Sequence, residues 1–275
     1  MRFTIAFKQL IFAIIILSSN PVKAQNFILP NAYAHNDYWH KRPLFDALDN
    51  GFTYIEADIY LRKEKLIVAH ILPWLKKKKT LEELYLMPLL QYVEKNKEDK
   101  KLRNDTINTL TLMIDIKSDP EKTYTTLARL LEKYRSILSG YDDHHVTIRN
   151  VTIVITGHKP KDLVNASENR LIFMDADLRQ TGRDSSNNVY PIASCKYSRL
   201  VKWKDTGNIH ENEIQRLLYY VKEAHKSGIK VRLWASPENK AVWAELLKCN
   251  VDLINTNRLK ALRKFLISDR LLVIK

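Results

Sequence analysis

The chain has 275 residues, of which 45% are hydrophobic and 28% charged, with six glycines and a formal net charge of +14. This length allows one large domain or two small ones, and the composition excludes a disordered, collagen-like or disulfide-stapled chain. No glycine-rich phosphate-binding loop or dinucleotide fingerprint occurs in the sequence, which disfavours nucleotide-driven phosphoryl transfer.

The positive charge comes from lysines spread along the whole chain. Charge alone does not distinguish nucleic acid, an anionic membrane or an acidic substrate as the partner. No nucleic-acid-binding motif accompanies the lysines, so we interpret them as a solvated surface and expect no nucleic acid partner. Cys195 and Cys249 lie far apart and form no metal-binding or disulfide framework, so free or buried thiols are expected.

The start of the chain has the pattern of a secretory signal peptide. Basic residues precede an apolar run over residues 10–17, and the small residues Val22 and Ala24 suit a cleavage site. The run is too short to be read as a membrane-spanning helix, and no later segment has the ~20 apolar residues that such a helix needs. We therefore predict a cleaved signal peptide over residues 1–24, one domain over residues 25–275, and a secreted or periplasmic location.

Short apolar runs alternate with longer amphipathic stretches along the rest of the chain, which is typical of βα units around a parallel sheet. Strands are predicted over residues 31–35, 53–60, 110–117, 150–156, 171–175, 190–195, 229–235 and 251–256. Helices are predicted over residues 80–96, 120–138, 211–227, 237–248 and 259–266. No linker or internal repeat divides the chain, so this count predicts a single-domain α/β fold, the (βα)8 TIM barrel.

Charged side chains gather on one face of the second and third predicted strands. Glu56 and Asp58 alternate with apolar neighbours, and Asp115 and Lys117 do the same. Active sites of such barrels lie at the carboxyl ends of the strands. Three converging carboxylates would repel one another unless cations compensate, and one divalent cation, Mg²⁺ or Ca²⁺, suits such oxygen ligands. Pairing with buried Lys or Arg is the alternative, and Lys117 could contact a substrate phosphate.

Two histidines are expected at the same mouth of the barrel. His35 ends the first predicted strand, and His70 ends the segment 65–70, which looks like a strand returning from a turn. Two imidazoles that flank a phosphodiester can act as general base and general acid. Either histidine alone fits a core or capping role equally well, but together beside the carboxylates they favour catalysis.

In their order along the chain, these residues resemble those of a superfamily of metal-dependent phosphodiesterases. It includes glycerophosphodiester phosphodiesterases, phosphatidylinositol-specific phospholipases C and the spider-venom phospholipase D toxins. The resemblance implies a (βα)8 fold, one Mg²⁺ or Ca²⁺ held by Glu56, Asp58 and Asp115, and an acid/base pair formed by His35 and His70.

Residues 34–38 and 44–48 look most like a secreted, poorly characterised bacterial branch of this superfamily. Glycerophosphodiesterases typically carry Arg directly after the first His and Asp after the second, whereas this chain has Asn36 and Ile71. The resemblance therefore does not imply the substrate.

Residues at the ends of later predicted strands are candidates for contact with a substrate head group. His158 follows the fourth strand, and Trp234 ends the seventh, where it resembles an aromatic residue of the superfamily; a barrel-filling Trp is the alternative. With Lys117 they form the predicted substrate-binding set. Weaker candidates at other strand ends are Asp175, Asp177, Lys196 and Tyr197.

Trp74 and Lys76 to Lys79 follow His70 in the sequence. An aromatic residue beside four lysines would suit peripheral contact with anionic lipid, to which each lysine contributes on the order of 1 kcal/mol. A lysine run before a helix is usually a solvated surface, which is our preferred interpretation.

Taken together, the residues and the resemblance predict a metal-dependent phosphodiesterase that hydrolyses or cyclises a small-molecule or lipid phosphodiester. A glycerophosphodiester and a phospholipid head group are the expected substrate types. The alternatives are a non-catalytic barrel that binds a phosphorylated ligand or lipid head group, and a phosphomonoesterase. The sequence leaves the oligomeric state and the division of roles between the two histidines open.

Overall fold

The computed structural model describes residues 28–71, 79–98, 109–181 and 188–273. The predicted signal peptide and residues 74–78 of the aromatic and lysine segment lie outside these ranges, and the domain boundary at residue 25 stays a prediction. Within the described ranges, no helix combines the length and the apolar character needed to cross a membrane. Both cysteines are buried free thiols, as expected.

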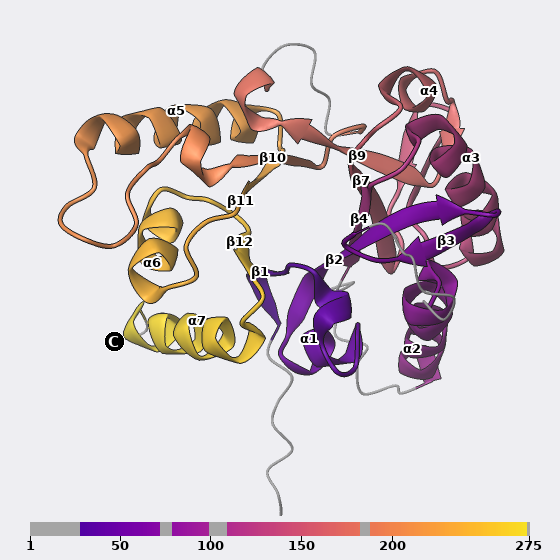
Figure 1. Ribbon diagram of the computed structural model, residues 1–275, viewed down its shortest axis with the longest axis horizontal. Coiled ribbons are helices and arrows are strands. Elements are labelled where there is room, and N and C mark those ends of the chain that lie inside the picture. The colour runs from indigo at the N-terminus through magenta and orange to yellow at the C-terminus, as the bar shows by residue number, and fades with distance from the viewer. Residues whose placement is uncertain (1–27, 72–78, 99–108, 182–187, 274–275) are drawn as a thin grey trace, which may run out of the picture.

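Eight parallel strands form a nearly closed barrel with helices around its outside (Figure 1). They follow the order β11-β10-β9-β7-β4-β2-β1-β12. Between β11 and β12 the ring is joined by a single bridge, which pairs Arg232 with Leu253. In this bridge the amide of Leu253 donates to the carbonyl of Val231 at 3.0 Å. The bounds of the eight strands are β1 (Leu29–Ala34), β2 (Phe52–Arg62), β4 (Leu110–Ile116), β7 (Val151–Gly157), β9 (Ile172–Asp177), β10 (Ile192–Lys196), β11 (Lys230–Trp234) and β12 (Ile254–Thr256). Every one overlaps a predicted strand, so the TIM-barrel prediction is confirmed.

The helices lie between the strands, and each predicted helix has a counterpart. The α-helices are α1 (Phe45–Asp49), α2 (Met87–Glu98), α3 (Pro120–Leu131), α4 (Lys161–Asn165), α5 (Glu211–Lys226), α6 (Lys240–Lys248) and α7 (Leu259–Val273). Shorter turns are η1 (Asp37–Trp39), the π-helical η2 (Glu82–Leu86), η4 (Glu132–Tyr134), η5 (Leu178–Gln180) and η6 (Tyr197–Arg199). Helix α6 begins later than predicted because the side chain of Asn239 caps it by accepting from the amide of Val242 at 3.0 Å.

In the part of the chain that the structure describes, four further strands lie outside the parallel ring. β3 (Lys65–Val68) returns antiparallel to β2, as the sequence predicts, and brings His70 back to the barrel mouth. A small antiparallel sheet of β5 (Gly140–Asp142), β6 (His145–Thr147) and β8 (Asn169–Arg170) was not predicted. It follows helix α3, which ends at Leu131, before the predicted end of that helix at residue 138.

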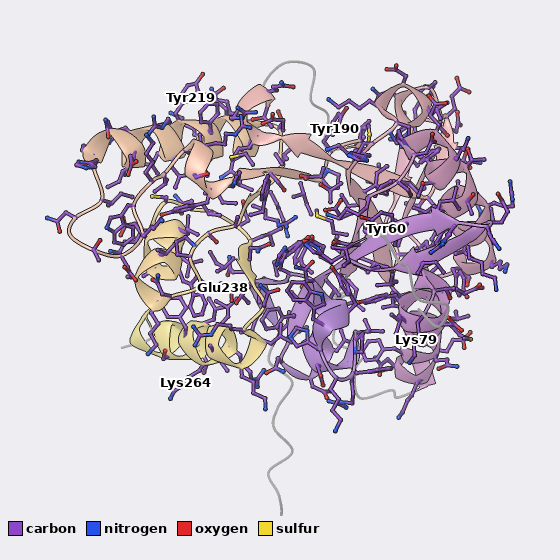
Figure 2. The ribbon with its side chains drawn as sticks, viewed as in Figure 1. Tyr60, Lys79, Tyr190, Tyr219, Glu238 and Lys264 are labelled. Carbon is purple, nitrogen blue, oxygen red and sulfur yellow. The ribbon has the colours of Figure 1, made fainter. Side chains whose placement is uncertain are left out.

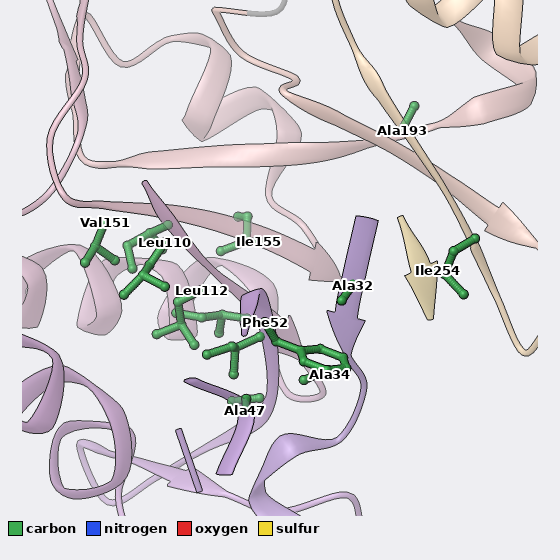
Figure 3. Packing of buried hydrophobic residues seen from close by; sticks show 14 of the residues in the cluster. Ala32, Ala34, Ala47, Phe52, Leu110, Leu112, Val151, Ile155, Ala193 and Ile254 are labelled. Atoms are coloured by element: carbon green, nitrogen blue, oxygen red, sulfur yellow. The ribbon is translucent and has the colours of Figure 1, made fainter. Parts of the chain in front are cut away.

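Strand alternation divides the side chains into two cores. Residues such as Leu110, Leu112 and Ile155 point outward and pack in the layer between strands and helices (Figure 3). A second, smaller cluster fills the inside of the barrel, and it includes Tyr33 and Met113. Toward the carboxyl ends of the strands the inward-pointing residues become polar and charged, which places the candidate site on top of this inner floor.

Candidate active site

Three carboxylates meet at the mouth of the barrel. The parallel register of β2 and β4 sets Asp58 directly beside Asp115, and Glu56 lies one inward position earlier on β2. One oxygen from each of the three lies within 4.8 Å of the others. Their apolar neighbours Ile55 and Ala57 face the helices, so the predicted alternation is confirmed.

Glu56 is paired with a buried cation that the sequence prediction missed. Arg232 on β11 donates from Nη2 to Glu56 Oε2 at 2.7 Å, and both residues are about 3% exposed. Tyr33 donates its hydroxyl to the same oxygen at 2.6 Å. Burial by itself would raise the pKa of Glu56, but Arg232, His35 and the bond from Tyr33 hold it below its usual range. For Glu56, the alternative interpretation, pairing with a buried Arg, is therefore confirmed.

Lys117 lies between the other two carboxylates. Its Nζ donates to Asp115 Oδ2 at 2.6 Å and lies 3.4 Å from Asp58 Oδ2. Burial raises the pKa of Asp115 to about 6 despite the opposing effect of Lys117, and the charges of Asp58 and Glu56 act in the same direction as burial. Two cations thus face three carboxylates, which leaves an excess of negative charge in a buried place.

The carboxylates keep oxygens available for a cation. Asp58 Oδ1 and Asp115 Oδ1 are buried and have no hydrogen-bond partner, which costs free energy unless something else satisfies them. Glu56 Oε1 lies 3.9 Å from Nε2 of His35. Hard divalent cations prefer such an all-oxygen set. The residues present therefore fit one divalent cation, and the choice of Mg²⁺ or Ca²⁺ stays a prediction.

Gly157, at the end of β7, gives Asp115 the space it occupies. Its φ of +72° lies in the left-handed region, and a Cβ there would overlap Asp115 Oδ1 and come within 2.6 Å of the carbonyl of Ile116. Only glycine tolerates both conditions without displacement. The position of the third carboxylate thus depends on a residue in the neighbouring strand.

His70 lies at the edge of the cluster. Its Nδ1 is 2.8 Å from Asp58 Oδ2, and its ring meets that of Trp39 edge-to-face with centroids 5.6 Å apart. Half of the His70 side chain is exposed.

His35 lies beside Glu56 and is held by amides. Its backbone amide donates to the carbonyl of Thr256, and its Nδ1 lies 3.1 Å from Asn257 Oδ1 and 3.3 Å from Asn36 Nδ2. Asn257 is held in turn by Glu238, whose Oε1 accepts from its Nδ2 at 2.8 Å; Glu238 is labelled in Figure 2. These supports leave Nε2 of His35 facing Glu56. Neither Asn257 nor Glu238 was predicted, because nothing in the sequence near His35 indicates them.

The predicted head-group residues are spread around the mouth. Trp234 is 41% exposed, and Lys196 Nζ lies 5.8 Å from its ring, so it does not fill the barrel. His158 is exposed and lies against the carbonyl of Ser118 rather than against the carboxylates.

The weaker candidates differ in their positions. Asp175 is buried and accepts hydrogen bonds from Thr156 and Ser194, while Lys159 donates to its carbonyl at 2.6 Å. Asp177 pairs with Arg179. Tyr197 is buried away from the mouth, with its hydroxyl bonded to the carbonyl of Trp203.

The chain is similar to fungal proteins. It is 31% identical over 282 residues to altered inheritance of mitochondria protein 6 of Eremothecium gossypii, which covers 86% of this chain and 70% of that protein. It is 28% identical over 261 residues to the altered inheritance of mitochondria protein 6 homolog of Arthroderma benhamiae, covering 85% of this chain and 82% of that protein.

These relatives contradict the predicted location. They come from fungi and their names refer to mitochondria, so the prediction of a secreted or periplasmic protein of a bacterial branch is wrong. The prediction depended on the basic and apolar composition of residues 1–24, which lie outside the described residues. Several kinds of targeting segment combine basic and apolar residues, so this composition does not identify a destination.

A solved structure and a family model also match the chain. The crystal structure of a glycerophosphodiester phosphodiesterase from Parabacteroides distasonis aligns with a TM-score of 0.54 and 17% identity, covering 87% of this chain and 98% of that one. At that identity the likeness shows the fold alone. The AIM6-like phosphodiesterase domain model matches residues 24–175, more than half of the chain. With the 31% identity to the Eremothecium protein, this match shows that the chain belongs to the family of AIM6-like phosphodiesterase domains.

Proposed function

We propose that this protein is a metal-dependent phosphodiesterase that uses His35 and His70 as its acid/base pair. The observation that carries the proposal is that the two imidazoles lie beside different carboxylates of the same cluster. His35 Nε2 faces Glu56, and His70 Nδ1 contacts Asp58. A phosphate placed over the carboxylates would have one imidazole near each of its ester oxygens.

Each group has a separate task in this proposal. One imidazole removes a proton from the nucleophile, and the other protonates the leaving oxygen. The nucleophile is water in a hydrolysis, or a neighbouring hydroxyl of the substrate when a cyclic phosphate forms. Lys117 contributes positive charge toward the phosphate oxygens, and Trp234 and His158 contact the head group at the rim.

Glu56, Asp58 and Asp115 would hold one Mg²⁺ or Ca²⁺. When bound, such a cation stabilises the negative charge that develops on the phosphate oxygens. The unpartnered oxygens of Asp58 and Asp115 and the raised pKa of Asp115 support this assignment, because both indicate a buried place that lacks positive charge.

The carboxylate site can be tested by isothermal calorimetry with Mg²⁺ and Ca²⁺. Asp58→Asn removes one charged ligand and should weaken binding clearly. Asp177→Asn is a matched control, since this carboxylate lies at the rim and pairs with Arg179. Equal affinity in the wild type and in Asp58→Asn would contradict the assignment.

The reaction can be tested with bis(p-nitrophenyl) phosphate, with and without Mg²⁺ or Ca²⁺. Turnover that depends on the cation supports the proposal, and phosphorus NMR of the products distinguishes hydrolysis from cyclisation. Preference for p-nitrophenyl phosphate would favour a phosphomonoesterase. Binding of phosphodiesters without turnover would favour the non-catalytic barrel, which needs positive charge but no acid/base pair. Glycerophosphodiesters and phospholipids are the first natural substrate types to compare.

A further inference from the structure

A cleft of about 600 Å³ opens beside His70, between the loop that follows β1 and the end of β3. Its lining combines the imidazole with mainly apolar side chains: Trp39, Pro43, Val68, Ile71 and Leu84. None of the roles assigned above to the carboxylates, Lys117 or the two histidines requires this space.

Two large apolar side chains at the cleft are strongly exposed. Trp39 is 58% exposed and Ile71 is 68% exposed. One exposed apolar residue on a protein surface needs no explanation, but two that flank a candidate catalytic group indicate a binding site for apolar material.

The turn that carries Trp39 is anchored, although the Trp39 side chain is exposed. Its turn, η1, is anchored from below by the buried Asp37, which accepts from the amide of Leu44 at 2.6 Å and from the hydroxyl of Tyr85 at 3.0 Å. His40 spans the other side, with Nδ1 2.9 Å from the carbonyl of Asp37 and Nε2 3.3 Å from that of Asn257. A wall fixed before the ligand arrives loses little entropy on binding, which favours affinity.

The cleft is continuous with the candidate catalytic cluster. Trp39 packs edge-to-face on the ring of His70, and Nδ1 of that ring contacts Asp58. One substrate molecule could therefore occupy both places, with its phosphate over the carboxylates and a substituent of that phosphate in the cleft. Lys41 and Lys79, the latter labelled in Figure 2, also line the cleft and offer positive charge to an anionic molecule.

We infer that this cleft binds the apolar substituent of the substrate, so that the substrate is an amphiphilic phosphodiester with an alkyl or acyl chain on its His70 side. This inference rests on the proposed phosphodiesterase function. Trp39 and Ile71 contact the chain, while the phosphate lies over the carboxylates.

The test is a series of methyl alkyl phosphates, from ethyl to octyl, followed by phosphorus NMR with Mg²⁺ or Ca²⁺. Each buried methylene should raise kcat/KM about two- to fourfold over the first few carbons. Trp39→Ala and Ile71→Ala should each flatten this dependence on chain length. Tyr219→Ala and Ile148→Ala remove exposed apolar side chains elsewhere and should keep the wild-type slope.

The outcomes separate the inference from the function. If the diesters are cleaved with the same rate at every chain length, or if Trp39→Ala and Ile71→Ala keep the wild-type slope, the inference is wrong while the proposed function stands. If no diester, including bis(p-nitrophenyl) phosphate, is cleaved, the proposed function itself fails. If both variants lose only their binding to anionic vesicles and keep the wild-type slope, the two residues contact membrane instead and the inference is overturned.

Discussion

Replacing Arg232 by Met should destabilise the protein strongly. The guanidinium donates to Glu56 at 2.7 Å and to Asn255 Oδ1 at 2.9 Å, and it stacks 4.0 Å from the ring centre of Tyr33. Met fills much of the same volume but removes the charge. The carboxylate of Glu56 would then stay buried without the positive charge of Arg232, and would keep the short hydrogen bond from the Tyr33 hydroxyl.

The size of the expected loss in the free energy of unfolding follows from the burial of both Arg232 and Glu56. Removing one member of a buried ion pair typically costs about 3 to 5 kcal/mol, because the other charge is left uncompensated. Arg179→Met is the matched control: its pair with Asp177 is as short, at 2.8 Å, but both side chains are about one third exposed. Such pairs contribute at most about 1 kcal/mol.

Urea unfolding at pH 7 in buffer without divalent cations measures both variants. Arg232→Met combined with Glu56→Gln should recover part of the loss, because the amide carries no charge and still accepts from Tyr33. The loss in Arg232→Met should also shrink as the pH falls toward 5, since the pKa of Glu56, which Arg232 keeps low, rises in the variant and the carboxylate takes up a proton. A loss in Arg232→Met no larger than in Arg179→Met would refute this reasoning.

Three other predictions concern the mouth of the barrel. Gly157→Ala should weaken Mg²⁺ or Ca²⁺ binding and cost more stability than Gly207→Ala, which has the same left-handed backbone (φ +66°) but open space around it; equal effects in calorimetry and urea unfolding would contradict the steric argument. Burial raises the pKa of Asp115 to about 6, so the folded protein binds this proton more tightly than the unfolded chain does. Without divalent cations, the resulting gain in the free energy of unfolding is fully present below about pH 4 and is lost as the pH rises through 6. Asp115→Asn should remove this dependence, worth no more than about 3 kcal/mol, and an unchanged slope of urea stability against pH would count against it. His35→Ala and His70→Ala should each lower kcat about 10² to 10⁴-fold with folding intact by circular dichroism, and near wild-type turnover in either would remove the acid/base pair.

The sequence predicts those features that depend on local alternation. Glu56 and Asp58 alternate with buried apolar residues on one strand, so their shared face is a local property, and the barrel then brings Asp115 beside them. Partners from distant strands leave no such local pattern. Arg232 lies 176 positions from Glu56, and its pairing depends on the closed ring of strands.

The same limit applies to the supports of His35. Asn257 lies 222 positions away, and amide side chains are common at strand ends, so neither spacing nor residue type indicates it. His40 has a distant partner too: its side chain is only 20% exposed, and its ring bridges the backbone carbonyls of Asp37 and Asn257. The sequence thus predicts which residues gather at the mouth better than it predicts what holds them there.

The pairing of β1 with β12 has a consequence for the order of folding. His35 takes its backbone partner from Thr256 and its side-chain partner from Asn257, so one candidate catalytic group is positioned by the last strand of the ring. Contacts of such sequence separation form late, because a long loop must close first. A nascent chain that has exposed β1 through β11 but not β12 would hold its carboxylates without an oriented His35. Catalytic competence should therefore appear only as the barrel closes, in one step with the final strand.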